Sequence, residues 1–368
     1  MRPRSILFVL AGLMVALLSP AVVAAGSQSG AVFTLSNSTS GNRVLVWHRA
    51  ADGSLSPAGS VATGGTGTGA GLGSQGALTL SPNHRWLYAV NPGSDEVSVF
   101  RVQGTHLRLV EVAPSGGHMP ISVTARGRLV YVLYGGGDGN IQGFARSTDG
   151  ILDPIVGSSQ PLSQAAPGPA QIGFSPNGDN LVVTEKGTNR ITFYDVDDNG
   201  AAGAPEWRSS AGATPFGFEF TGNGTLLVSE AFGGAPDASA TSSYRFRPNG
   251  NLRVLDGPVF TTETAACWVA ITNNGNYAYV TNTGSGSVSG YSVADNGDLT
   301  LLDADGVTAS TGVGSSPIDA AFDATSEHLY TLLAGSDKIA ILDRMADGSL
   351  DNMGSVTVAD GAVGLAAY

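Results

Sequence analysis

The feature that most constrains this fold is a repeated unit in which short apolar strands alternate with tight turns. Copies of its first half begin at Gly76, Pro120, Pro169, Pro215, Cys267 and Pro317. Equivalent mid-strand residues recur every 43 to 52 positions, at Tyr88, Tyr131, Val182, Leu227, Tyr279 and Tyr330. Each unit ends in a second turn, mostly Asp-Gly or Asn-Gly, which supplies the positive φ that tight hairpins need. Seven such turns lie within 51–57, 103–109, 148–154, 198–204, 248–254, 295–301 and 346–352. Four strands at this period are typical of a propeller blade, so the sequence predicts an all-β, seven-bladed β-propeller with four antiparallel strands per blade.

The two ends of the chain supply complementary parts of one blade. Residues 31–49 match the second and third strands of a unit, but no first strand precedes them. Residues 361–368 match a first strand, and nothing follows. We therefore expect the N- and C-terminal strands to share one blade, which closes the ring and leaves no free sheet edge.

The first 25 residues have the pattern of a signal peptide, with Arg2 and Arg4 before an apolar run and small residues up to Ala25. This predicts a signal peptide over 1–25, a single propeller domain over 26–368 and a secreted or periplasmic protein; an uncleaved anchor is the alternative. No later segment is apolar enough to span a bilayer. Loss of both arginines takes the net charge from −12 to −14, which disfavours nucleic acid and anionic lipid as partners. Cys267 is the only cysteine, so no internal disulfide can form. No spacing of residues suggests a metal or cofactor site, and we expect a monomer.

The order of strands in a blade sorts the loops onto two faces. The turns between first and second strands share one face with the Asp-Gly turns, and the turns between second and third strands share the other with the blade-connecting segments. We expect a binding cleft at the axis of this second face. Its extended loop, within 230–246, is a further place where function could lie.

Two acids occupy the same position of adjacent blades on this second face. Glu185 and Glu230 end their second strands, where other blades have residues such as Asn91 and Asn282. The pair could serve as general acid and base, or each could accept backbone hydrogen bonds in its own turn. His118 is the histidine best placed on this face to act as a base, although a histidine without an identified partner is more often structural.

The chain resembles the seven-bladed lactonase family, which includes 6-phosphogluconolactonase-type propellers and carboxymuconate cyclases. The resemblance covers 31–368 and rests on the Ser-Pro-Asn-Gly turns, the second turns, Gly168-Pro169 and Glu185. A weaker resemblance to YVTN-type surface propellers runs through 279–282. The lactonase resemblance implies a small lactone or carboxylate ligand and no cofactor.

This sequence departs from the family at the residues that would carry the chemistry. Where the family has Gly-Pro-Arg-His, this chain has Gly168-Pro169-Ala170-Gln171, and the early histidine of the family is replaced within 73–76. The candidate substrate-binding residues are Arg190, Lys186, Gln171, Asn91, Asn282 and Trp268. Two functions stay open: an exported lactonase or related cycloisomerase, and a non-enzymatic propeller that binds a ligand or protein through its central face.

Overall fold

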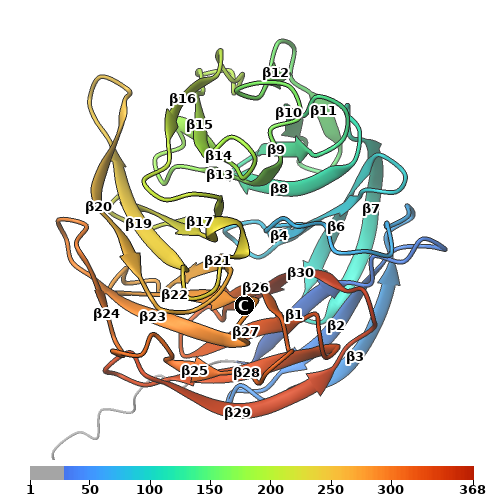
Figure 1. The fold of residues 1–368 in the computed structure, drawn as a ribbon. Helices are drawn as coiled ribbons and strands as arrows, with labels where there is room; N and C mark the ends of the chain where they lie inside the picture. Colours follow the sequence, from blue (N-terminus) through green and yellow to red (C-terminus); the bar gives the residue numbers. More distant parts are fainter. Residues whose placement is uncertain (1–28) are drawn as a thin grey trace, which may run out of the picture.

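The structure is a computed structural model that describes residues 29–368. It consists of seven antiparallel sheets arranged as blades around an axis (Figure 1). The described residues hold one short helix, the 3₁₀ turn η1 (Phe232–Gly234). The predicted seven-bladed, all-β propeller is therefore confirmed, whereas the predicted signal peptide at 1–25 lies outside the described residues.

Four strand positions recur from the axis to the rim of each blade. The first strands are β4 (Leu78–Leu80), β8 (Pro120–Arg126), β13 (Pro169–Phe174), β17 (Pro215–Phe220), β21 (Ala266–Ile271), β26 (Pro317–Phe322) and β30 (Val363–Ala367). The second strands are β5 (Trp86–Asn91), β9 (Leu129–Tyr134), β14 (Asn180–Glu185), β18 (Leu226–Glu230), β22 (Tyr277–Asn282), β27 (His328–Leu333) and β1 (Gly30–Leu35). The third strands are β6 (Glu96–Gln103), β10 (Asn140–Arg146), β15 (Arg190–Asp195), β19 (Ala240–Phe246), β23 (Ser287–Val293), β28 (Lys338–Arg344) and β2 (Arg43–Arg49). The outer strands are β7 (His106–Pro114), β11 (Leu152–Pro154) with β12 (Gln160–Pro161), β16 (Glu206–Ser209), β20 (Leu252–Phe260), β24 (Leu299–Leu301) with β25 (Ala309–Ser310), β29 (Leu350–Thr357) and β3 (Leu55–Ala62). We number the blades 1 to 7 in this order, so that blade 7 contains both ends of the described chain.

Blade 7 closes the ring as the sequence predicts. Strand β30 pairs with β1 in a sheet of order β3-β2-β1-β30, with Phe33 opposite Ala366. The buried Arg49 of β2 donates from Nε to the Tyr368 carbonyl at 3.0 Å and lies 3.3 Å from Asp323 of blade 6. Arg49 thus connects β2 to the C-terminal residue of its own blade and to the neighbouring blade 6.

Neighbouring blades pack through the second turns. The hydroxyl of Tyr131 in blade 2 donates to the Gly200 carbonyl in the turn of blade 3, at 2.6 Å. Gly200 has φ +84°, and a Cβ there would lie 2.3 Å from the Leu129 side chain. Glycine is therefore required at position 200 for two reasons: its backbone has a positive φ, and the preceding blade approaches too closely to leave space for a side chain. Tyr330 of blade 6 makes the same contact with blade 7, where its hydroxyl donates to the Gly53 carbonyl at 2.8 Å.

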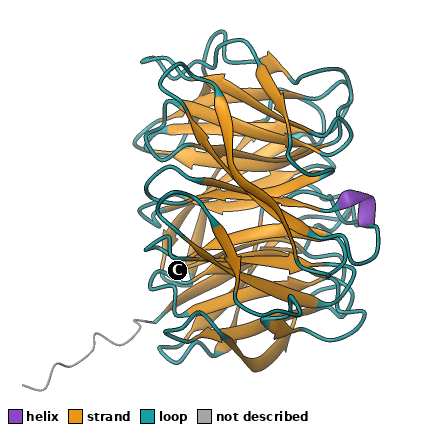
Figure 2. Cartoon of the chain, turned by 60° about the vertical axis from the view of Figure 1, so that its left-hand side comes forward, coloured by secondary structure: helices purple, strands orange, loops and turns teal. Residues whose placement is uncertain are grey.

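The two faces of the ring carry different loops, as expected. In the side view of Figure 2, η1, which lies between a second and a third strand, protrudes from one face, and the C-terminus lies toward the other. We call the face with η1 and the blade-connecting segments the connection face. The opposite face, which bears the turns between first and second strands, is the turn face.

Candidate functional site

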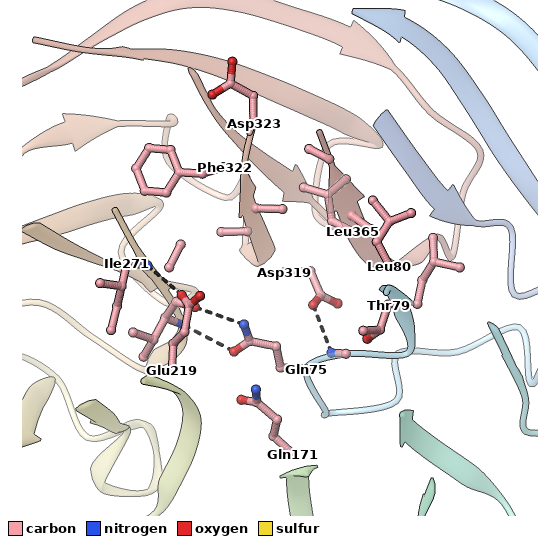
Figure 3. A pocket seen from close by; sticks show the side chains of 18 of the residues that line it. Gln75, Thr79, Leu80, Gln171, Glu219, Ile271, Asp319, Phe322, Asp323 and Leu365 are labelled. Atoms are coloured by element: carbon pink, nitrogen blue, oxygen red, sulfur yellow. Dashed lines mark hydrogen bonds between the residues drawn. The ribbon is translucent and has the colours of Figure 1, made fainter. Parts of the chain in front are cut away.

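A central hollow of about 350 Å³ opens on the turn face, at the axis of the ring (Figure 3). Side chains from the first strands line it, among them those of Gln171, Glu219 and Asp319. A second hollow of about 420 Å³ on this face shares Thr79, Gln171 and Glu219 with the first. Both hollows lie on the turn face, whereas the sequence predicts a binding cleft on the connection face, so the predicted cleft stays a prediction.

Glu219 is the accessible carboxylate of the central hollow. Its Oε2 accepts the Ile271 N–H at 2.6 Å, and its Oε1 accepts no hydrogen bond from the described residues. The side chain reaches the solvent of the hollow, yet the ring surrounds it, and this enclosure raises the pKa of Glu219 to about 7 against the opposing effect of the Ile271 hydrogen bond. A carboxyl with such a pKa can take up and release a proton near neutral pH.

Asp319 is a second acid of the hollow, but its oxygens are already occupied. It lies at a bulge of β26 with φ +20° and accepts the N–H groups of Gly364 at 2.9 Å and Gly76 at 3.4 Å. Burial raises its pKa to about 7, with the two backbone hydrogen bonds acting in the opposite direction. Asp319 thus joins blade 6 to the first strands of blades 7 and 1.

Two glutamine amides clamp first strands to one another below the hollow. Gln171 donates to the Phe218 carbonyl at 2.9 Å and accepts the Phe218 N–H at 2.7 Å. Gln75 makes the same pair of bonds with Val269, at 3.0 and 3.3 Å. The predicted binding residue Gln171 therefore does line the hollow, although its amide already serves the scaffold.

The segment 73–76 extends from blade 1 across the axis and contacts the first strands of blades 3 and 5. The Gln75 N–H donates to the Ala170 carbonyl of blade 3 at 3.0 Å, whereas its side chain bonds Val269 of blade 5. Gly217 makes room for this crossing, because a Cβ there would lie 2.3 Å from Gln75 Oε1. We call 73–76 the plug.

Two predicted binding residues, Lys186 and Trp268, each donate a hydrogen bond to the backbone of the plug. Lys186 Nζ donates to the Gly73 carbonyl and lies 4.6 Å from the Phe216 ring centre. Trp268 Nε1 donates to the Ser74 carbonyl at 3.2 Å. Burial lowers the pKa of Lys186. Both side chains hold the plug in place, and neither lines the central hollow.

Glu185 and Glu230 differ from the expected geometry, because they do not face a common cleft. Glu185 is buried and accepts hydrogen bonds from the Ser163 N–H at 2.9 Å, from Thr188 at 2.8 Å, from Thr192 at 2.6 Å and from the Ser163 hydroxyl. These bonds match the alternative of local turn chemistry. A catalytic role for Glu185 stays a prediction that this geometry does not favour.

Glu230 is enclosed in the same manner within blade 4. It accepts the Gly212 N–H at 2.7 Å, the Ser242 hydroxyl at 2.8 Å, the Ser210 hydroxyl at 2.9 Å and the Tyr244 hydroxyl at 3.1 Å. Burial raises the pKa of Glu230, and these hydrogen bonds oppose the shift. Glu230 shares no hydrogen-bond partner with Glu185, so the structure does not bring the two acids together.

The remaining predicted residues lie within blades or at the surface. Asn91 donates to Ser98 at 2.7 Å, and Asn282 donates to Ser289 at 2.8 Å, both in buried positions. Arg190 donates to the Ser163 hydroxyl at 3.1 Å and stacks 3.7 Å from the centre of the Trp207 ring. His118 is exposed, with Nδ1 2.9 Å from Asp95 of blade 1. None of these side chains lines the central hollow.

The sequence did contain a signal for the two acids that were missed. Glu219 lies in PFGFEF and Asp319 in PIDAAF, and each is the one charged residue of an otherwise apolar first strand. A carboxylate in a strand that lines the axis has to face either the channel or a buried partner. The repeat alignment emphasised the second-strand ends instead, where the acids proved to be structural hydrogen-bond acceptors.

Two further observations concern the described residues as a whole. Within 29–368, no group of three or more His, Cys, Asp or Glu side chains is placed to hold a metal ion. No helix in this part of the chain is long and apolar enough to cross a bilayer.

Comparison with solved structures finds the same fold in bacterial propellers. A putative 6-phosphogluconolactonase from Bacteroides uniformis has a TM-score of 0.72 and 19% identity, over 92% of this chain and 99% of that one. One from Bacteroides fragilis has a TM-score of 0.70 and 18% identity, over 93% and 98%. The periplasmic gluconolactonase of Pseudomonas aeruginosa has a TM-score of 0.69 and 17% identity, over 91% and 98%.

Sequence comparison gives the family directly. The family described as "Lactonase, 7-bladed beta-propeller" matches residues 39–165 and 155–231, which together make up more than half of the chain. No match was found among curated proteins. The repeat, the closed ring of seven blades and this match agree, and the chain belongs to the seven-bladed β-propeller lactonase family.

Proposed function

We propose that this protein hydrolyses a small neutral lactone in the central hollow of the turn face, with Glu219 as general base. The observation that carries the proposal is a solvent-accessible carboxylate with a free oxygen and a pKa near 7, at the base of a hollow in a lactonase-family propeller. Family membership supports lactone chemistry, and the geometry supports this location for it.

The chemistry requires one group that moves a proton twice. Glu219 Oε1 takes a proton from a water molecule as its oxygen attacks the lactone carbonyl carbon. The ring C–O bond of the resulting tetrahedral intermediate then breaks, and the protonated Glu219 returns the proton to the leaving alkoxide. The product is the open-chain hydroxy acid, and Glu219 ends in its starting state.

The charge of the hollow favours a neutral substrate over a phosphorylated one. Glu219, Asp319 and Asp323 line it, and no Lys or Arg does, although Asp323 is paired with the buried Arg49. His84 also lines it, and burial lowers its pKa, which keeps the imidazole neutral near pH 7. Arg126 lines only the neighbouring hollow, where its guanidinium donates to the Pro176 carbonyl at 3.0 Å. The carboxylate substrate of a cycloisomerase would meet the same repulsion.

We place the activity outside the cytoplasm, in the periplasm or beyond, with the protein as a monomer. The signal-like pattern of residues 1–25 supports export, and a soluble ring closed by its own termini needs no second copy. The alternative function, a non-enzymatic propeller that binds a ligand or protein, is favoured by the absence of the family's Arg-His pair at 170–171.

A lactone panel with two matched variants tests the proposal. Wild-type protein, Glu219→Gln and Glu185→Gln are assayed on a neutral aldonolactone and its phosphorylated counterpart, with spontaneous hydrolysis subtracted. We expect wild type to prefer the neutral lactone, with a rate that rises from about pH 6 to about pH 8 as Glu219 loses its proton. Glu219→Gln should lower kcat by about 10²- to 10⁴-fold, while Glu185→Gln retains turnover.

The opposite pattern would locate the activity elsewhere. Loss of turnover in Glu185→Gln with full activity in Glu219→Gln would return the catalytic role to the buried acid. If wild type hydrolyses no lactone above the spontaneous rate, the binding alternative holds.

A further inference from the structure

Three arginines gather on the hairpin of β19 and β20 in blade 4, and Figure 1 shows these two strands at the edge of the ring. Arg245 and Arg253 are directly opposite each other in the pairing of these strands. Arg247 follows in the hairpin turn, and all three line a surface hollow of about 490 Å³ with Phe246, Pro248 and Asn249. We call this feature the arginine hollow.

Within the described residues, none of these three arginines forms an ion pair with a carboxylate. The ion pairs of 29–368 involve Arg49, His118 and His328, so no carboxylate pairs with Arg245, Arg247 or Arg253. The Nε of Arg245 is buried without a hydrogen-bond partner, although its Nη2 reaches Thr225 and the Asp295 carbonyl. Like charges directly opposite each other on two strands are destabilising. Their accumulation in a chain with 30 acidic and only 18 basic residues suggests a missing anion.

A second cross-strand pair of arginines, in blade 1, provides a contrast. Arg101 is opposite Arg108 in the pairing of β6 and β7. There Arg101 lies 4.9 Å from the centre of the Trp86 ring, so the fold itself gives this cation a favourable contact. Arg253 and Arg247 are exposed and make no such ring contact.

We propose that the arginine hollow binds the phosphate group of a small solute. Guanidinium forks match the oxygens of phosphate, and its charge of about −1.5 to −2 at pH 7 would offset most of three positive charges. The net charge of −12 favours a small solute over a membrane or nucleic acid, because the molecule as a whole repels extended polyanions. This site is separate from the proposed lactonase hollow and does not depend on it.

Calorimetric titration of the full chain with inorganic phosphate, at low ionic strength, tests the site. Wild type should bind phosphate, and Arg253→Gln and Arg247→Gln should each weaken binding about tenfold or more, because each removes a charge-assisted hydrogen bond. Arg108→Gln, which removes an exposed arginine of the contrasting pair, should bind as wild type does. The two arginines of the test are exposed, and Arg253 faces a like charge, so neither variant should lower the melting temperature.

Three results would overturn the proposal. Wild type could show no binding of phosphate. Arg253→Gln and Arg247→Gln could bind as tightly as Arg108→Gln. Binding to vesicles of phosphatidylglycerol that Arg253→Gln abolishes, without binding of free phosphate, would assign the hollow to a lipid headgroup instead of a small solute.

Discussion

Glu185 and Glu219 illustrate how the surroundings of a carboxylate decide what it can do. Glu185 is buried, and both of its oxygens accept hydrogen bonds from Ser and Thr groups of blade 3 and the segment before it. Glu219 keeps one oxygen without a partner in a hollow that water can enter. The first arrangement stabilises a fixed charge, and the second leaves a group available to exchange protons.

This difference predicts a structural role for Glu185 that thermal unfolding can measure. In Glu185→Gln, an amide NH₂ replaces one acceptor oxygen and faces donors, so the free energy of unfolding should fall by about 1–3 kcal/mol. Glu206→Gln is the matched control, because Glu206 is exposed on β16, and its melting temperature should stay within experimental error of wild type. Equal melting temperatures for the two variants would contradict the structural role.

The roles of these two acids could not be separated by sequence alone. Glu185 is the last residue of a strand. A side chain at this position can either face the channel or accept hydrogen bonds from a neighbouring loop. The choice depends on Ser163, which approaches Glu185 from the connection between blades 2 and 3. Gln171 was a candidate binding residue for a cleft on the connection face, and the structure places it in the hollow of the turn face instead.

At the scale of elements, two kinds of contact hold the ring together. One kind recurs between consecutive blades, and the other is the strand pairing in blade 7 that joins the two ends of the chain. The tyrosine-to-turn contacts join blades that are consecutive in sequence, as Tyr279 of blade 5 does with Gly348 of blade 6 at 2.7 Å. Blade 7 additionally depends on β30, which arrives from the other end of the chain. Packing on this strand should therefore contribute to the stability of the whole ring.

Two substitutions of the same chemistry measure that contribution. Val363 is buried at the start of β30, whereas Val313 is fully exposed in a connecting segment. Val363→Ala should lower the free energy of unfolding by about 2 kcal/mol, from lost burial and the cavity left behind. Val313→Ala should change it by less than about 0.5 kcal/mol. Denaturant unfolding followed by tryptophan fluorescence gives both values, and a similar small effect for both would show that β30 adds little.

At the scale of the whole molecule, the sequence predicted the number of blades, the shared blade and the sorting of loops onto two faces. Each of these follows from a local pattern that recurs, so an error in one copy is corrected by the others. The face that carries the hollow could not be predicted in this way. It depends on the plug, a segment of blade 1 whose path across the axis is fixed by partners in blades 3 and 5.

Stability of the ring should depend on pH through Asp319. Its pKa is about 7 in the folded state and near 3.8 when unfolded, so between these values the folded state holds a proton that the unfolded state has lost. Stability from this residue is therefore greatest below about pH 4 and falls as pH rises toward 7, by about 1.4 kcal/mol for each unit of pKa difference.

Unfolding of wild type, Asp319→Asn and Asp153→Asn at pH 5 and pH 8 tests this dependence. The loss of stability from pH 5 to pH 8 should be smaller in Asp319→Asn than in wild type. Asp153 is exposed on β11 and accepts no hydrogen bond from the described residues, so Asp153→Asn should retain the wild-type loss. The same loss in all three proteins would show that Asp319 is ionised in the folded state across this range.

The plug affects how a ligand can enter and leave the central hollow. A propeller channel open at both ends would let a ligand arrive on one side and depart on the other. With 73–76 across the axis, this passage is obstructed by the backbone of the plug, and the hollow is lined by residues toward the turn face. If this hollow is the lactonase site proposed above, the lactone that enters and the hydroxy acid that leaves would both pass through the turn face, so accumulated product should slow turnover by competition.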